Sequence, residues 1–402
     1  MLVHKFFHVT GGAEVFFFET GRVLSEQGHD VAYFSTHSEK NNPSKFAQYF
    51  SEAPNYTAGS LLRKASGIGS MIYSRKAKKK FERLLDDFSP DIVHVFSIQT
   101  HITPSILDAC REANVPVVMS CNDYKHICPN YKLFHHGRLC EECKGGRFYN
   151  AIKNRCCKNS LTFSVASSIE SYVHAALDVY QKNVHTFLFA SEFMAHKTEE
   201  FWRGSFRWRI LRNPFDTKKN SLHGEQGNYF LYFGRIIDEK GVDVLVEAAR
   251  LVPDVEVIVV GDGPDKQKLE GYVEKLSLSN VRFIGAKWGD ALNDYLRNCR
   301  CVIVPSLWYE NFPYVILQAF AAGKPVIGSN RGGIPELIQD GQHGLVYQAN
   351  DPGALAAAMR KLKDNSDVAE QMGVRARRYV EKEFNDATFY KQLMSIYQEV
   401  LA

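Results

Sequence analysis

Two cations in the segment GRIIDEKG, residues 234–241, could bind a phosphate group. Arg235 and Lys240 fall between an apolar run at 229–233 and a helical pattern that begins near Gly241. The N–H groups at a helix N-terminus favour an anion, and an arginine can bind phosphate oxygens in a bidentate manner. The segment therefore predicts a diphosphate site. A pair of solvated surface cations would give the same local pattern.

A carboxylate further along the chain, Glu310, lies where α/β proteins bind ligands. It follows the apolar run 301–304, which is typical of a buried strand, and Pro313 suits the start of the next helix. A second apolar run and the glycine pair Gly332 and Gly333 come after it. Ligands of open α/β sheets bind at the carboxyl ends of the strands. The pattern predicts that Glu310 contacts a ligand, although an incidental surface glutamate would also fit.

Alternating strand and helix patterns must position these residues. The apolar, strand-like runs lie at 2–5, 30–34, 91–97, 115–120 and 186–189 in the first half of the chain, and at 229–233, 255–260, 281–285 and 301–304 in the second. Helical patterns separate most of them, which predicts an α/β fold with a doubly wound parallel sheet in each half. A chain of 402 residues exceeds the size of a single core, so we expect two domains. The polar stretch after Asn213 and Pro214 predicts a boundary near residue 220.

The stretch around Glu310 resembles the signature of retaining glycosyltransferases of family 4, which have the GT-B fold. In that family a glutamate, a seven-residue gap and a second glutamate precede a small-x-Gly-x-Pro-Val-Ile run. Glu310 matches the first glutamate and AAGKPVI at 321–327 matches the run, whereas Gln318 stands at the second glutamate. The resemblance covers most of the chain. It implies two Rossmann-like domains: an acceptor-binding domain at 1–220, a nucleotide-sugar domain at 221–385, and a helix at 386–402 that packs back on the first.

The resemblance also implies roles for individual residues. Arg235 and Lys240 would hold the donor diphosphate and stabilise it as it leaves, which is electrostatic catalysis, and Glu310 would accept hydrogen bonds from the sugar hydroxyls. Asn122 stands where the family has a histidine that reaches the donor sugar, and a neutral amide cannot become cationic. The implied donor-binding positions are Gly11, Gly12, Asn122, Gly234, Gly285, Lys287, Asn311, Phe312, Pro313 and Gln318.

A cysteine-rich insert at 121–160 interrupts the strand and helix alternation. Cys140 and Cys143 form a Cys-x-x-Cys pair, and Cys128 and Cys156 lie about a dozen residues to either side. This spacing is compatible with a structural zinc held by four thiolates, or with nearby histidines as ligands. A loop with buried thiols is the alternative. We expect catalysis itself to need no cofactor.

Composition limits the function classes. A net charge of +4 is too small to indicate nucleic-acid binding, and no apolar run reaches the length of a transmembrane helix. The start of the chain reads directly into a strand, which predicts a cytoplasmic protein with few disulfides. The basic segment 71–85 is either a solvated helix face or an amphipathic helix on the anionic inner face of a membrane.

Together these features predict a metal-independent, retaining glycosyltransferase of polysaccharide or lipid-linked glycan assembly. Its donor is expected to be a UDP- or GDP-sugar and its acceptor a glycan or lipid-linked glycan. A sugar-nucleotide epimerase of the same fold is an alternative. An inactive nucleotide-sugar-binding module is another, because Asn122 and Gln318 depart from the family pattern.

Overall fold

The computed structural model describes residues 1–53, 69–202, 204–217 and 227–402. It divides into two compact units. Unit 1 comprises residues 1–133, 141–214 and 389–402, and unit 2 comprises residues 134–140 and 215–388. The boundary predicted near residue 220 lies outside the described residues.

Unit 1 is built on a six-stranded parallel sheet in the order β2-β1-β3-β4-β7-β8. Its central strands are buried on both faces, as expected for a parallel sheet covered by helices. The strands are β1 (Leu2–Val3), β2 (Tyr33–Phe34), β3 (Val93–Val95), β4 (Val117–Cys121), β7 (Thr186–Phe189) and β8 (Trp208–Ile210). The helices are α1 (Gly12–Glu26), η1 (Ala47–Tyr49), α3 (Arg75–Phe88), α4 (Ser105–Glu112), α5 (Tyr149–Lys153), α6 (Leu161–Ala176) and α7 (Glu192–Phe201).

Serine caps set the starts of three helices in unit 1. The hydroxyls of Ser74, Ser160 and Ser191 each accept a hydrogen bond from the backbone N–H three residues later, at the starts of α3, α6 and α7. Each cap satisfies one of the N–H groups that a helix leaves without a partner. For this reason α6 begins at Leu161 and not near Phe163, where its apolar pattern becomes clear.

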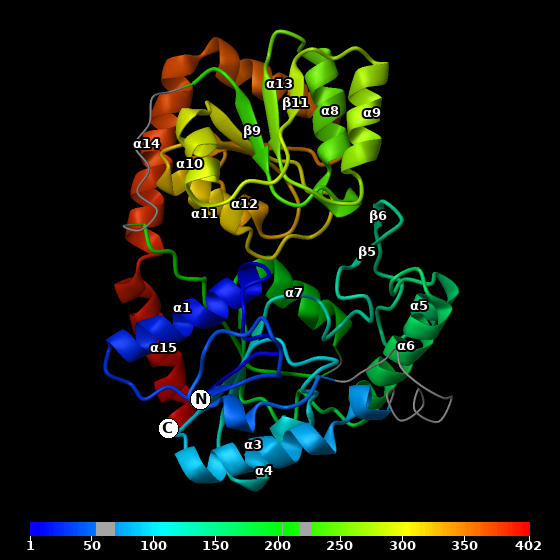
Figure 1. Cartoon of the computed structure of the whole chain (residues 1–402), viewed down its shortest axis with the longest axis vertical. Coiled ribbons are helices and arrows are strands. Elements are labelled where there is room, and N and C mark those ends of the chain that lie inside the picture. Colours follow the sequence, from blue (N-terminus) through cyan, green and yellow to red (C-terminus); the bar gives the residue numbers. More distant parts are fainter. Residues whose placement is uncertain (54–68, 203, 218–226) are drawn as a thin grey trace. The chain divides into compact units, whose positions relative to one another are not determined.

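The C-terminal helix α15 (Asp386–Leu401) completes the core of unit 1 (Figure 1). Phe389, Leu393, Ile396 and Tyr397 of this helix are buried in one cluster with residues of α1, β1, β4 and β7. The phenol of Tyr397 is 2.8 Å from Nδ1 of the buried His94. Unit 1 is therefore assembled from both ends of the chain.

Unit 2 contains a second six-stranded parallel sheet, in the order β11-β10-β9-β12-β13-β14. The strands are β9 (Phe230–Phe233), β10 (Val257–Val260), β11 (Val281–Phe283), β12 (Cys301–Val304), β13 (Val326–Ser329) and β14 (Gly344–Tyr347). The helices are η2 (Asp238–Lys240), α8 (Val242–Leu251), α9 (Lys266–Lys275), α10 (Gly289–Asn298), α11 (Tyr314–Ala321), α12 (Ile334–Leu337), α13 (Pro352–Asp364) and α14 (Ser366–Glu383). The two doubly wound sheets confirm the predicted fold class.

The strand order of unit 2 reverses between β9 and β12. From β9 the chain winds outward through β10 and β11, and from β12 it winds the other way through β13 and β14. The carboxyl ends of β9 and β12 are therefore at the point of reversal, which is where doubly wound sheets bind ligands.

Part of the cysteine-rich insert belongs to unit 2. An antiparallel hairpin of β5 (Phe134–His135) and β6 (Arg138–Leu139) lies within the insert, and residues 134–140 group with unit 2. Phe134 is buried in the core cluster of unit 2, and Leu139 packs against that cluster. The rest of the insert groups with unit 1. The predicted assignment of the whole insert to the first domain is thus too simple.

The basic helix α3 uses its apolar side within unit 1. Ala77, Phe81, Leu84 and Leu85 are buried, whereas Arg75, Lys76, Lys79 and Arg83 are exposed. Lys78 forms an ion pair with Glu112 of α4. Because the apolar side faces the protein core, only charge remains for contact with a membrane. Among the described residues, every helix is too short or too polar to cross a bilayer.

Candidate active site

The predicted cations and the predicted carboxylate of unit 2 meet at the point where the strand order reverses. Arg235 and Lys240 lie in the loop after β9, and Glu310 lies in the loop after β12. Lys240 Nζ is 2.6 Å from Glu310 Oε1, although 70 residues separate them in the chain. Two of the three residues proposed to act in catalysis are thus in direct contact. Arg235 lies in the same loop as Lys240, with its side chain exposed and in no ion pair among the described residues.

Glu310 is held in place from several directions. The hydroxyl of Ser306 donates to the same Oε1 at 2.6 Å, and the backbone N–H of Gly333 donates to the Glu310 carbonyl at 2.7 Å. Gly332 has φ +59°, and a Cβ there would be 2.1 Å from the Glu310 carbonyl oxygen. A side chain at position 332 is therefore excluded, so this glycine allows the loop after β13 to close over Glu310.

The electrostatics keep Glu310 ionised. Burial raises the pKa of this carboxyl group, since Glu310 is only 5% exposed. The charge of Lys240 and the hydrogen bonds from Lys240 and Ser306 lower the pKa by more, so that it lies below its ordinary value. The site thus contains a carboxylate that accepts hydrogen bonds at neutral pH. Lys240 also lies 5.3 Å from the ring centre of Trp308, within the range of a cation–π contact.

Lys240 has donors to spare for a ligand. Its ammonium carries three N–H groups, of which one is directed to Glu310. The side chain is 22% exposed, so water or a ligand can reach it. Gly241, at φ +66°, follows immediately and starts α8, and a Cβ there would be 2.1 Å from the Pro305 carbonyl oxygen. The tight packing of this glycine holds the N-terminus of α8 close to the loop after β12.

The other predicted donor-binding residues of unit 2 lie on neighbouring loops. Asn311, Phe312 and Pro313 lead into α11, with Pro313 at its N-cap and not at its first helical position. Gln318 is on α11, partly buried, and its side chain makes no hydrogen bond within the described residues. Gly285, at φ +74°, follows β11, and its carbonyl accepts a hydrogen bond from the N–H of Gly261 at 3.0 Å.

Two glycines show how closely these loops approach one another. A Cβ on Gly261 would be 2.0 Å from the Gly234 carbonyl oxygen, and a Cβ on Gly263 would be 2.2 Å from the Ile236 carbonyl oxygen. The segment after β10, residues 261–264, thus packs its backbone on the Arg235 loop. Lys287 is partly buried, two residues beyond Gly285.

Unit 1 has its own point of strand reversal, between β1 and β3. Gly11 and Gly12 follow β1 at the start of α1. Glu14 lies in the first turn of α1, buried, where Thr10 donates to it at 2.8 Å and His4 is 3.6 Å away. Burial lowers the pKa of His4 to about 3, so this histidine is neutral. Among the described ion pairs, Glu14 is paired with this neutral histidine alone. A carboxylate in that setting disfavours phosphate at this N-terminus and suits a hydroxyl donor.

Asn122 follows β4 directly, and its side chain points to a role in binding. Its Nδ2 is buried and has no hydrogen-bond partner among the described residues. A buried amide donor without a partner is costly, so a ligand atom that accepts from it would be favoured. The sequence singled out Asn122 by its departure from the family pattern, but the missing partner is visible only in the structure.

The four cysteines proposed as zinc ligands do not form a metal centre in this structure. Within the described residues, which include all four, no group of three or more Cys, His, Asp or Glu side chains is placed to hold a metal ion. Cys143 is instead buried in a small apolar cluster with Phe148 and Ala151, and Cys156 packs against it. Thiols pack well as small apolar groups. This packing favours the alternative of a loop with buried thiols, and the structural zinc stays a prediction.

Sequence reasoning missed the residues that support Glu310. Ser306 and Trp308 belong to no motif, and only their nearness to Glu310 in the same loop could have indicated them. The glycine pair at 332 and 333 was visible in the sequence, but its contact with Glu310 depends on the pairing of β12 with β13.

Two family models match this chain and together cover most of it. The model described as Glycosyltransferase Family 4 matches residues 10–219, and the model described as Glycosyl transferases group 1 matches residues 215–379. Among curated proteins, the amylovoran biosynthesis glycosyltransferase of Erwinia amylovora is 29% identical over 205 residues, which is 48% of this chain and 50% of that protein. Several curated relatives, this one included, align over only about half of their own length.

Solved structures share the whole fold. A sucrose-phosphate synthase from Thermosynechococcus elongatus has a TM-score of 0.70 at 17% identity and covers 99% of this chain and 98% of its own. The Anabaena protein HepE, solved in complex with UDP-glucose, has a TM-score of 0.65 at 15% identity, with 99% and 98% covered. At these identities the likeness establishes the fold, and the predicted GT-B architecture is confirmed.

Proposed function

Because this chain belongs to the glycosyltransferase family that the models Glycosyltransferase Family 4 and Glycosyl transferases group 1 describe, we propose that it transfers a hexose from a nucleotide-diphosphate sugar to an acceptor hydroxyl. We further propose that the anomeric configuration is retained and that the product belongs to polysaccharide or lipid-linked glycan biosynthesis. The observation that carries the proposal is the contact of Lys240 with Glu310 at the reversal point of unit 2, beside the exposed Arg235.

The arrangement suits a leaving diphosphate. Arg235 offers a guanidinium that no described carboxylate neutralises, and Lys240 offers the donors that Glu310 does not use. The N-terminus of α8 adds its N–H groups. When the bond between the sugar carbon and the phosphate oxygen breaks, negative charge grows on that oxygen, and preorganised cations lower the barrier.

Glu310 has the complementary task of holding the sugar. Its ionised carboxylate can accept hydrogen bonds from sugar hydroxyls, and its charge keeps Lys240 directed at the site. In the proposed retaining reaction the acceptor hydroxyl attacks from the face that the diphosphate leaves, and a departing phosphate oxygen takes the hydroxyl proton. This route needs neither a nucleophilic carboxylate nor a metal ion.

The donor base and the acceptor are proposals drawn from chemistry and likeness. HepE was solved with UDP-glucose, which supports a UDP-sugar, and a GDP-sugar is the second candidate. The relative from Erwinia amylovora is an amylovoran biosynthesis enzyme, which supports a glycan acceptor. We place the reaction at the cytoplasmic face of a membrane, where the exposed cations of α3 would contact anionic lipid.

Donor binding and turnover test the proposal. Thermal shift with UDP-, GDP-, ADP- and dTDP-sugars identifies the donor, because a ligand raises stability by RT ln(1 + [L]/Kd). With that donor, Arg235→Ala should lower kcat by about 10²–10³ and leave the fold intact, the scale of losing one preorganised donor. A folded Arg235→Ala variant with near-normal kcat would contradict the diphosphate assignment.

The same assay separates the other functions of this fold. An epimerase converts the donor sugar without an acceptor, whereas a transferase needs one. A binding module shifts the thermal transition but gives no product above background. Glu310→Gln is the matched variant: it preserves size, removes the charge, and should lose most transfer activity.

A further inference from the structure

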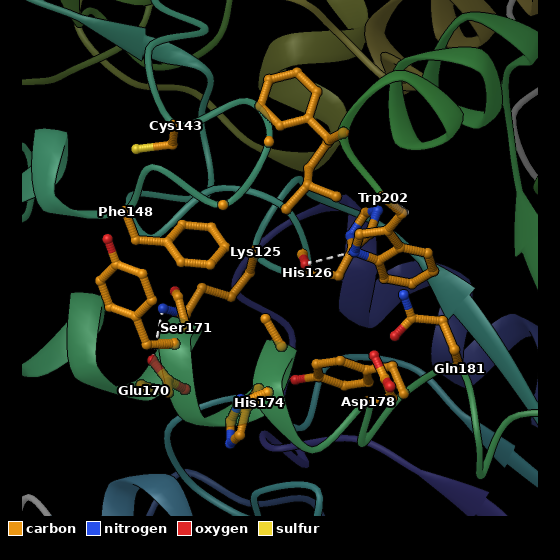
Figure 2. Close-up of a pocket in the computed structure, with 18 residues that line it drawn as sticks. Lys125, His126, Cys143, Phe148, Glu170, Ser171, His174, Asp178, Gln181 and Trp202 are labelled. Carbon is orange, nitrogen blue, oxygen red and sulfur yellow. Dashed lines mark hydrogen bonds and ion pairs between the residues drawn. The ribbon is translucent and has the colours of Figure 1, made fainter. Parts of the chain in front are cut away.

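A pocket in unit 1 has no role in the reaction proposed above. It has a volume of about 370 Å³ and lies between the cysteine-rich insert and the helices α6 and α7 (Figure 2). Its lining comes from residues 125–127, from residues 143–148, from the second half of α6 with the turn after it, and from the end of α7. None of the proposed donor-binding or catalytic residues lines it. Its volume is within the range of small-molecule sites.

A buried ion pair lines one wall of this pocket. Lys125 Nζ is 2.7 Å from Glu170 Oε2, and the two side chains are 9% and 1% exposed. Lys125 also donates to the carbonyl of Pro129 at 3.1 Å. Oε1 of Glu170 is buried and accepts no hydrogen bond from any described residue. A buried carboxylate oxygen without a donor is costly, so a ligand that supplies an O–H group would be favoured here.

Aromatic rings form other parts of the lining. Phe148 and Trp202 flank the pocket from opposite sides in Figure 2. The indole N–H of Trp202 donates to the His126 carbonyl at 3.3 Å, and the Tyr172 hydroxyl accepts from the N–H of Tyr149 at 3.1 Å. These bonds fix the orientation of two of the rings. Apolar faces with a few convergent polar groups suit a ligand that has an apolar C–H face and a rim of hydroxyls.

The charges of the pocket favour a neutral ligand. Lys125 and Glu170 balance one another, and Asp178 adds a carboxylate at the margin. His174 is neutral, because burial lowers its pKa by more than the nearby Glu170 raises it. Among the described residues of the lining, Lys125 is the one cation paired with Glu170, so an anion would meet a carboxylate whose charge is already balanced. A second cation would compete with Lys125 for a carboxylate that is already paired.

We propose that this pocket binds one neutral sugar unit, with a hydroxyl donating to Glu170 Oε1 and a C–H face packed on an aromatic ring of the wall. It is a carbohydrate subsite separate from the donor site of unit 2. The assignment of this sugar to the acceptor glycan rests on the proposed function. The proposal that the pocket binds a sugar is independent of it.

Free sugars titrated into the full-length protein test the proposal. The neutral probes are glucose, galactose, mannose and N-acetylglucosamine, and glucosamine and glucose 6-phosphate serve as charged comparisons. Saturation-transfer NMR measures the binding of each sugar. We expect at least one neutral sugar to bind. Ala176→Trp, at an exposed lining position, should weaken that binding at least tenfold by filling the pocket. Leu177→Trp is the matched control, because Leu177 is the next residue, is 55% exposed and lies outside the lining, so this variant should bind as wild type.

A second variant tests the polar wall without risking the fold. Glu170→Gln alone would leave Lys125 buried and unpaired, so it is combined with Lys125→Met, which replaces the pair by neutral groups of similar size. The double variant should bind the neutral sugar about tenfold more weakly, since a hydrogen bond to a charged group is lost. The proposal is overturned if no neutral sugar binds, if only a charged sugar binds, or if Ala176→Trp or the double variant binds as wild type does.

Failure here is distinguishable from failure of the proposed function. The affinity of Ala176→Trp for a nucleoside diphosphate should equal that of wild type, because the pocket contains no donor-binding residue. Intact transfer with no binding of free sugars overturns the pocket alone. Sugar binding that Ala176→Trp abolishes, in a protein without transferase activity, upholds the pocket and contradicts the proposed function.

Discussion

Removing Lys240 should cost the protein both stability and turnover. In Lys240→Ala the Glu310 carboxylate stays buried and loses its cation. Of its described side-chain hydrogen bonds, the one from Ser306 remains. Breaking a buried ion pair by removing one partner costs about 3–5 kcal/mol. Lys240 is partly exposed, and water can reach the space that it leaves. We therefore expect the lower end, about 3 kcal/mol, which corresponds to a fall of about 6–12 °C in the Tm of a domain of this size.

Two variants separate the ion pair from the catalytic role. Arg235→Ala removes an exposed cation that has no described partner, so it should change the free energy of unfolding by less than about 0.5 kcal/mol while still lowering kcat. Glu310→Gln combined with Lys240→Ala removes both charges, and it should be more stable than Lys240→Ala alone. With Glu310→Gln alone as the fourth corner, the change in the double variant minus the changes in the two single variants gives the coupling energy of the pair.

The pH dependence of the same variants has a definite sign. The folded state lowers the pKa of Glu310, so the pair contributes stability above the ordinary carboxyl pKa and loses it as the pH falls through the folded value. In Lys240→Ala burial still raises that pKa, whereas the charge and the hydrogen bond of Lys240 no longer lower it. The gap in stability between wild type and Lys240→Ala should therefore be full at pH 7 and should close in acid. Calorimetry across pH 4–8 measures it. A Lys240→Ala variant as stable as Arg235→Ala at pH 7, or a gap that does not vary with pH, would refute the reasoning.

Four further outcomes follow from the structure. Gln318→Glu should lower the Kd for the nucleoside diphosphate several-fold, since a charged acceptor binds ribose hydroxyls more strongly, and Gln318→Ala should raise it. Neither change should alter kcat. Equal Kd values for wild type and both variants would show that Gln318 is not in the donor site. Unit 1 should lose stability as the pH falls below about 6.5, because burial lowers the pKa of His4, His94 and His126 to about 3 each. Between these values only the unfolded chain takes up protons, which costs roughly 2 kcal/mol of unfolding free energy per histidine by pH 5. An unfolding free energy, measured by circular dichroism, that stays constant down to pH 5 would contradict this. The exposed cations of α3 should give vesicle binding that needs anionic lipid and disappears at high salt, and sedimentation without such a dependence would return α3 to an ordinary solvated surface. Elemental analysis of the reduced protein tests the structural zinc: about one tightly held zinc per chain would support Cys128, Cys140, Cys143 and Cys156 as ligands, and well under one would favour packed thiols.

The sequence predicted most of the fold because its signals are local. Apolar runs of four to seven residues alternate with helical patterns in both halves, and this alternation distinguishes strand from helix without any tertiary information. The candidate site was predicted by residue type: Arg235, Lys240 and Glu310 all lie at strand ends. Their contact was not predictable in the same way. It depends on the pairing of β9 with β12, which are not consecutive strands, and this pairing brings together residues 70 positions apart.

The cysteine-rich insert shows where such reasoning stops. It has no period, so its path could not be predicted, and neither the hairpin that joins unit 2 nor the pocket against α6 was expected. Lys125 and Glu170 are 45 residues apart, and nothing in either local sequence indicates a pair. The cysteine spacing suggested a metal because spacing is all that a sequence shows. In the structure, two of these thiols pack as apolar groups.

The contribution of α15 to unit 1 has a consequence for how the protein is made. A ribosome releases the strands and helices of unit 1 long before the helix that fills its core with Phe389, Leu393 and Tyr397. Until then the apolar side chains of α1 and β1 that share this cluster lack the cover of α15, whereas nearly all of unit 2 is already synthesised. The core of unit 1 therefore stays incomplete during synthesis, while the second half of the chain can already fold. Chaperone binding should concentrate on this exposed face, and ribosome-bound chains arrested before residue 386 should show protease-sensitive N-terminal halves beside a resistant unit 2.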